Sequence, residues 1–152
     1  MNVNGNITIL AWINPESFPQ EWCHIVGGYE SGGSYPGYAL AIGSTGDIAV
    51  WNGTSWQVST DGIVSTGSLQ HVGYTNDNTD NTYYYAGSSD STDTAGNPNS
   101  YAGVRAISAD ASGAQEFDGI IDELQIHSAA RSAAWIGEEY AQTNNNATFW
   151  GS

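Results

Sequence analysis

Residues 116–127, EFDGIIDELQIH, are the stretch that most directly predicts how this chain folds. Apolar and polar side chains alternate along its second half, as they do in a strand with one buried and one solvated face. Alternation places Asp122, Leu124 and Ile126 together on the buried face. The solvated face then carries the three remaining side chains, Glu123, Gln125 and His127. The stretch therefore predicts a half-buried β-strand.

The same stretch holds four carboxylates within eight positions, which raises the question of a paired-carboxylate active site. Jelly-roll β-glucanases hold a nucleophile and an acid/base about 5 Å apart on one strand, in a Glu-x-Asp motif followed by a further Glu. Glu116 and Asp118 match the first half of that motif, but Ile120 and Ile121 occupy the place of the third acid. We therefore expect a non-catalytic protein. A glycoside hydrolase using Glu116 and Asp118 is the lesser alternative.

Asp122 is a charged residue that alternation places on an apolar face. We favour a structural role in which its carboxylate accepts hydrogen bonds from the backbone. The alternative is that it helps to hold Ca²⁺, which takes oxygen ligands from scattered loops. A structural calcium ion is therefore the one cofactor that we consider. The histidines carry no short ligand spacing, and we expect each to be a structural or surface residue rather than a metal ligand: His24, His71 and His127.

Composition narrows the class of protein and its partners. The 152 residues suit a single domain spanning positions 1–152. Two basic residues face 16 acidic ones, so nucleic acid and anionic membranes are poor partners. Nineteen glycines and many aromatic residues are typical of an all-β extracellular domain. Cys23 lies in an alternating stretch and is expected to be a buried, unreactive thiol.

Short strand-like runs separated by turns predict a β-sandwich rather than alternating strands and helices. Asn52-Gly53 predicts a hairpin, because these residues adopt the positive φ angles of a tight turn. Trp51 pairs with Thr54 in a two-residue loop and with Trp56 in a longer one. Residues 90–100 predict a surface loop, and residues 132–142 predict a short helix capped by Ser132.

Both hairpin registers place Trp51 and Trp56 on one face, opposite Ile48 and Val50. Two indoles beside Asp47 are suited to stacking on the apolar faces of sugars, although the same face could equally form the core. Two loop tyrosines are second-choice contact residues, Tyr35 and Tyr38. Three further tyrosines follow one another in the sequence. We expect Tyr83 and Tyr85 to lie in the core and Tyr84 to face outward.

A family resemblance rests on the order of several stretches. FDGIIDELQIHSAARSAAWI resembles the closing strand and helix of concanavalin A-like, laminin-G-like domains, and MNVNGNITILAWINPESFP resembles their opening strand. GYALAIGSTGDIAVW and SLQHVGYTND resemble the strands between them. The sequence departs from the family at Leu69 or Gln70, where a Trp is usual, and at Ala86, where an Asp is usual. The family's first strand would lie before Asn2; we expect it to be missing and to leave a sheet edge for another chain to fill.

The resemblance implies an antiparallel jelly-roll sandwich with one short C-terminal helix. It also implies a non-catalytic carbohydrate-binding or adhesion module of an extracellular protein, with glycans as ligands and calcium in some members. The start of the chain lacks the features of a secretion signal, so it is either part of a secreted protein or a protein that is never exported. The second possibility favours a virion-surface structural protein, for which a homo-oligomer is expected.

Overall fold

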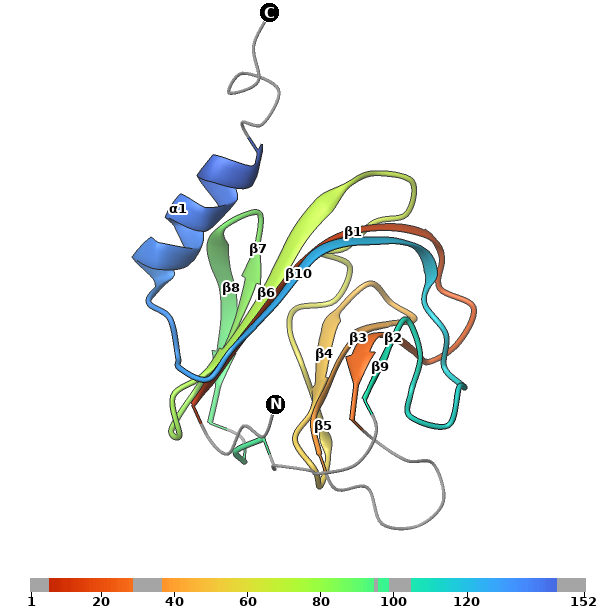
Figure 1. The fold of residues 1–152 in the computed structure, drawn as a ribbon, viewed down its shortest axis with the longest axis horizontal. Helices are drawn as coiled ribbons and strands as arrows, with labels where there is room; N and C mark the ends of the chain where they lie inside the picture. Colours follow the sequence, from red (N-terminus) through yellow and green to blue (C-terminus); the bar gives the residue numbers. More distant parts are fainter. Residues whose placement is uncertain (1–5, 29–36, 95, 99–104, 145–152) are drawn as a thin grey trace, which may run out of the picture.

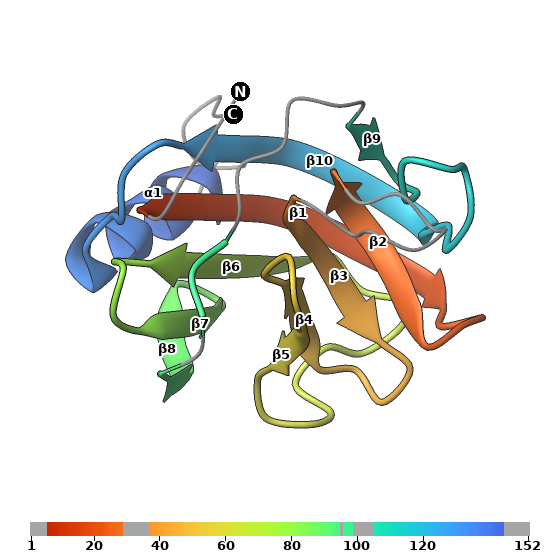
Figure 2. The ribbon, with the colours of Figure 1, turned by 90° about the horizontal axis from the view of Figure 1, so that it is seen from below.

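The computed structural model describes residues 6–28, 37–94, 96–98 and 105–144, and it places two antiparallel five-stranded sheets face to face (Figures 1 and 2). The helix-side sheet has the order β10-β1-β6-β7-β8, and the hairpin sheet has the order β5-β4-β3-β2-β9. The predicted sandwich with one C-terminal helix is confirmed. The elements are β1 (Ile7–Ser17), β2 (Trp22–Gly27), β3 (Ala39–Gly43), β4 (Ile48–Trp51), β5 (Trp56–Val58), β6 (Gln70–Asn76), β7 (Asn81–Tyr85), β8 (Ser88–Asp93), β9 (Ala106–Ile107), β10 (Asp118–His127) and α1 (Ala133–Asn144).

The core lies between the two sheets and takes inward-facing side chains mainly from β1, β2, β3, β4, β6, β7 and β10. In β1, for example, Ile7, Ile9 and Ile13 all point inward and are fully buried. Cys23 lies in the same core as a free thiol, and burial raises its pKa. A buried, protonated thiol is a small apolar side chain rather than a nucleophile, as the sequence predicted.

The hairpin between β4 and β5 is confirmed in the longer of its two registers. Trp51 pairs with Trp56, which leaves a four-residue loop. The Asn52 side-chain oxygen accepts hydrogen bonds from the backbone N–H groups of Thr54 at 2.9 Å and Ser55 at 3.0 Å. Gly53 has a φ of 98°, which a residue with a side chain rarely adopts. The Asn-Gly pair therefore closes the loop and holds the two tryptophans opposite each other.

The predicted loop at residues 90–100 is wrong at its start, because β8 (Ser88–Asp93) extends to Asp93. This strand pairs with β7 at the edge of the helix-side sheet, and most of its side chains are exposed. Backbone hydrogen bonds form such a strand without apolar alternation. Asp93 anchors its end, since its two carboxylate oxygens accept hydrogen bonds from Asn81 Nδ2 at 2.8 Å and from the Tyr83 hydroxyl at 2.9 Å.

A β-bulge in β10 overturns the predicted place of Asp122. Gln125 pairs with Leu10 while Asp122 pairs with Trp12, so two residues of β10 face one residue of β1. Glu123 has a φ of 50° at this point. The extra residue reverses the alternation, so Asp122 points outward and is exposed, while Leu124 still packs on the core.

Helix α1 covers part of the outer face of the helix-side sheet (Figures 1 and 2). Ser132 caps it as predicted, because its hydroxyl accepts a hydrogen bond from the Trp135 N–H at 3.2 Å. Ile136 packs on Leu10 and Tyr84. Tyr84 does point away from the core, as expected, but α1 leaves only 4% of it exposed.

Candidate functional site

The outer face of the hairpin sheet has a floor of small residues. Leu40, Ile42, Ile48 and Val50 fill the core, so the residues that alternate with them face outward. Cross-strand pairing aligns these outward positions across β3 and β4. Short side chains leave room for rings from neighbouring strands to lie across the sheet. The floor consists of Ala39, Ala41, Gly43 and Ala49.

Four ring side chains cover this floor, and together they form the aromatic cluster of Trp22, His24, Trp51 and Trp56. Trp22 stacks on Trp56, with ring centroids 4.5 Å apart and planes 14° from parallel. Trp51 lies 5.7 Å from Trp56 at 60°, and His24 meets Trp56 edge-on at 5.5 Å. Trp22 and Trp56 are half-buried, while Trp51 is only 8% exposed. The cluster thus offers two partly accessible indoles supported by a buried one.

His24 forms the base of the aromatic cluster and is fully buried. Burial lowers its pKa to about 4, and the negative charge of Asp110 opposes part of that shift. The imidazole is therefore neutral at pH 7. A neutral ring packs against indoles without placing a charge beneath them.

Asp47 lies in the turn between β3 and β4 and is 4% exposed. Its carboxylate accepts a hydrogen bond from the Thr45 hydroxyl and occupies the space that a side chain at Gly43 would need. Gly43 pairs with Trp22, so the carboxylate lies at the Trp22 end of the outer face. The structure therefore keeps Asp47 on the same face as the predicted tryptophan pair.

The sequence predicted Tyr38 at an accessible edge of the sandwich, and this prediction is wrong. It is 1% exposed within the core, where the guanidinium carbon of Arg105 lies 5.3 Å from its ring centroid. Burial raises the pKa of its hydroxyl. The residue directly before β3 belongs to the inward row of that strand, so its ring joins the core. Tyr35, the other second-choice contact residue, lies outside the described residues.

The sequence patterns did not single out Trp22 and His24 as members of the site. They are two residues apart in β2, so they share a face, and that signal was present in the sequence. Their meeting with Trp56 depends on the strand order, because β3 and β4 lie between β2 and β5. Local patterns do not encode such a long-range order.

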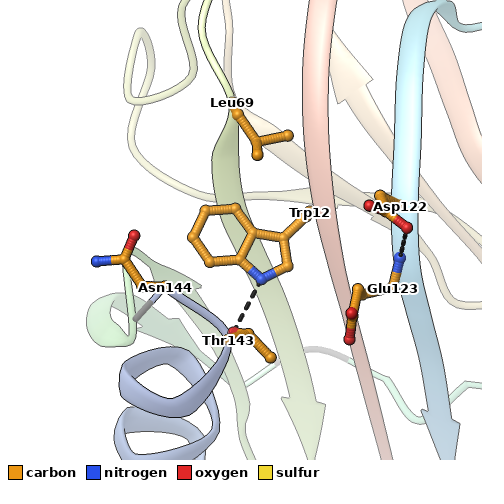
Figure 3. A pocket seen from close by; sticks show the side chains of 6 residues that line it. All are labelled: Trp12, Leu69, Asp122, Glu123, Thr143 and Asn144. Carbon is orange, nitrogen blue, oxygen red and sulfur yellow. Dashed lines mark hydrogen bonds between the residues drawn. The ribbon is translucent and has the colours of Figure 1, made fainter. Parts of the chain in front are cut away.

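A pocket on the helix-side sheet, the α1 pocket, lies between β10 and the end of α1 (Figure 3). Its volume is about 230 Å³. The Trp12 indole N–H donates to the Thr143 hydroxyl at 2.9 Å, and the ring stacks on Tyr140 with centroids 5.6 Å apart. These contacts hold α1 on the sheet. The pocket is lined by Trp12, Leu69, Asp122, Glu123, Thr143 and Asn144.

The remaining candidate residues are dispersed. Glu116 and Asp118 are both exposed on either side of the buried Phe117, and Asp118 accepts a 2.5 Å hydrogen bond from the Ser17 hydroxyl. Within the described ranges, no three or more His, Cys, Asp or Glu side chains gather as they would around a metal ion. A calcium ion at Asp122 stays a prediction. None of the helices in the described part of the chain has the length and apolarity to span a membrane.

No curated protein matches the sequence. A Bacteroides ovatus protein with a provisional carbohydrate-binding assignment is 20% identical, with a TM-score of 0.71 over 88% of this chain and 40% of its own. Domain 4 of AbnA, an extracellular arabinanase of Geobacillus stearothermophilus solved with arabinotriose, is 19% identical, with a TM-score of 0.65 over 90% of this chain and 66% of its own. This chain thus spans less than two thirds of either protein.

A third similar structure is the CBM40 of the Ruminococcus gnavus IT-sialidase, bound to α2,3-sialyllactose. It is 14% identical, with a TM-score of 0.67 over 91% of this chain and 84% of its own. These likenesses show the shared jelly-roll fold. A laminin-G-type family model matches residues 1–137 of the sequence. The chain therefore belongs to the concanavalin A-like lectin/glucanases superfamily.

Proposed function

We propose that this chain is a non-catalytic carbohydrate-binding module that acts outside the cell, and that the aromatic cluster is its glycan platform. The observation that carries the proposal is the Trp22–Trp56 stack, which lies half-buried on an otherwise small-residue sheet face. Indoles on an outer face expose apolar surface to water, which is unfavourable. A ligand that stacks on them would cover that surface.

Sugar rings present apolar C–H faces surrounded by hydroxyl groups. An indole of the aromatic cluster offers a flat apolar surface for the C–H face. Asp47, at the Trp22 end, is 4% exposed and already accepts a hydrogen bond from Thr45, and we propose that the exposed part of its carboxylate accepts a further one from a sugar hydroxyl. Apolar contact with Trp56 and Trp22, combined with hydrogen bonds at the rim, is therefore the binding mode that we propose.

The similar proteins support the class of ligand. The arabinanase domain was solved with arabinotriose and the sialidase module with sialyllactose, and both share this fold. Two alternatives stay predictions, a virion-surface structural protein and a hydrolase using Glu116 and Asp118. A partner chain at a sheet edge, with or without a homo-oligomer, also stays a prediction.

A glycan-array screen tests the proposal, run once with Ca²⁺ and once with a chelator. The wild-type chain is compared with Trp56→Ala, Trp22→Ala and the matched control Trp135→Ala. Trp135 is also a half-buried indole, but it lies on α1 with Arg131 over its ring. We expect both cluster variants to lose at least about tenfold in affinity, or ~1.4 kcal/mol, because the stacking surface is removed.

The control variant should bind glycans as the wild type does. Loss of binding on chelation would add a metal ion to the site. Silence of the wild type across the array would contradict the proposed function, and equal binding by Trp56→Ala and the wild type would contradict the proposed platform. Circular dichroism on each variant separates loss of contact from loss of folding.

A further inference from the structure

We propose that the outer face of the hairpin sheet selects uncharged saccharides and rejects acidic ones, which carry sialic acid, uronic acid or sulfate groups. The inference rests on the proposed function, because it names the ligand class of the same aromatic cluster. It follows from where the few positive charges of this chain lie.

The sequence contains two basic side chains against 16 acidic ones. The guanidinium of Arg105 lies over Tyr38, whose ring belongs to the core. The guanidinium carbon of Arg131 lies 4.9 Å from the ring centroid of Trp135, on α1 and the helix-side sheet. Aromatic rings thus hold both arginines away from the outer face of the hairpin sheet.

Carboxylates, in contrast, border this face. Asp47 covers Gly43 next to Trp22. Asp110, which is 1% exposed, acts electrostatically on the imidazole of His24 beneath Trp56. His24 is itself neutral at pH 7 and adds no positive charge. An anionic saccharide on the aromatic cluster would therefore meet a negative potential with no positive side chain to pair with.

Recognition of an acidic sugar has a specific physical requirement. The anionic group loses hydration on binding, and proteins offset this cost with charge-assisted hydrogen bonds, most often from arginine. A neutral sugar needs only stacking and ordinary hydrogen bonds, which the aromatic cluster and the Asp47 carboxylate can provide. The sialyllactose-binding module shares the fold, but at 14% identity the fold carries no ligand preference to this chain. We expect affinity for an acidic saccharide to be weaker than for its neutral counterpart by about tenfold or more.

The first test measures matched pairs of immobilised saccharides at pH 7.5 and 150 mM NaCl. The pairs are lactose with 3′-sialyllactose, dextran with dextran sulfate, and hydroxyethyl cellulose with carboxymethyl cellulose. The expected result is that the wild type retains the neutral member of at least one pair and binds its acidic partner about tenfold more weakly. Equal or tighter binding of an acidic member would overturn the inference while leaving the proposed function standing.

The second test adds one positive charge on the proposed face. Val58 is 42% exposed on β5 and lies two positions after Trp56, so it shares the same outer face. The Val58→Arg variant should raise retention of the acidic member severalfold. Ile120→Arg is the matched control, since Ile120 is 57% exposed on β10 of the other sheet and the change in net charge is identical.

The outcomes separate the two claims. An equal gain in Val58→Arg and Ile120→Arg would mean that net charge, not this face, governs retention, and would overturn the inference. No gain in a folded Val58→Arg would overturn it as well. Failure of the wild type to retain either member of any pair would contradict the carbohydrate function itself, and with it the inference.

Discussion

His24 and His71 are buried histidines whose pKa values are lowered. His24 lies under the aromatic cluster, and His71 lies against Trp12 and Tyr140 beneath α1. Burial lowers the pKa of each from its usual value to about 4, although nearby carboxylates, Asp110 for His24 and Glu139 for His71, oppose the shift. Both imidazoles are therefore neutral at pH 7.

We predict that the free energy of unfolding falls as the pH falls from about 6.5 to about 4. In that window the unfolded chain binds protons at these histidines while the folded chain does not, so acid favours unfolding. Above the window both states are neutral, and below it both are protonated. The full effect is on the order of 3 kcal/mol for each histidine.

Urea denaturation between pH 7 and pH 4.5 measures this effect. His24→Gln and His71→Gln should each flatten the pH dependence, whatever they do to stability at pH 7. His127→Gln is the control, because that ring is only half-buried on β10. Unchanged pH dependence in both of the first two variants would contradict the assignment.

At the scale of elements, β10 and the hairpin show what the sequence could predict. The hairpin followed from Asn52-Gly53, but its register did not, because the sequence allowed a two-residue or a longer loop and the structure has the longer one. The sequence did not predict the bulge in β10, because Glu123 takes a positive φ without the glycine that usually signals it. Because the extra residue of the bulge was not predicted, Asp122 was assigned to the buried face, whereas it faces outward. Only the Trp51 and Trp56 part of the aromatic cluster was predicted. Adding Trp22 required knowledge of the order of four strands, which the local sequence does not give.

The bulge predicts an unusual response to one substitution. Glu123→Gly should stabilise the protein by up to about 1 kcal/mol, because glycine adopts a positive φ without steric cost. Glu138→Gly should instead destabilise it by about 1 kcal/mol, because Glu138 is an exposed position inside α1. Thermal or urea unfolding of the two variants compares the same substitution in opposite backbone settings. A loss of stability in Glu123→Gly as large as that in Glu138→Gly would contradict the bulge.

At the scale of the whole molecule, the formal charge of −14 is the dominant property. Like charges repel within the folded state, and salt screens that repulsion. We predict that the melting temperature rises between 10 and 200 mM NaCl by roughly 2 to 4 °C, which corresponds to about 1 kcal/mol. The melting temperature should change less above 200 mM NaCl, because the screening length shortens most at low salt. Differential scanning calorimetry at pH 7.5 measures it, and a melting temperature that falls or stays constant would refute self-repulsion as a destabilising force.

The distribution of tryptophans over the two sheets provides the most direct test of the proposed glycan platform. Among the tryptophans that the structure describes, Trp22, Trp51 and Trp56 belong to the aromatic cluster, whereas Trp12 and Trp135 lie on the side of α1; the sixth, Trp150, lies outside the described residues. Each indole N–H gives a separate NMR signal, which Trp→Phe variants assign. We would titrate the ¹⁵N-labelled chain with the neutral oligosaccharide that binds best on the array. The account predicts shifts of the Trp22, Trp51 and Trp56 signals while those of Trp12 and Trp135 stay in place. Shifts confined to Trp12 and Trp135 would contradict it and move the ligand to the α1 pocket.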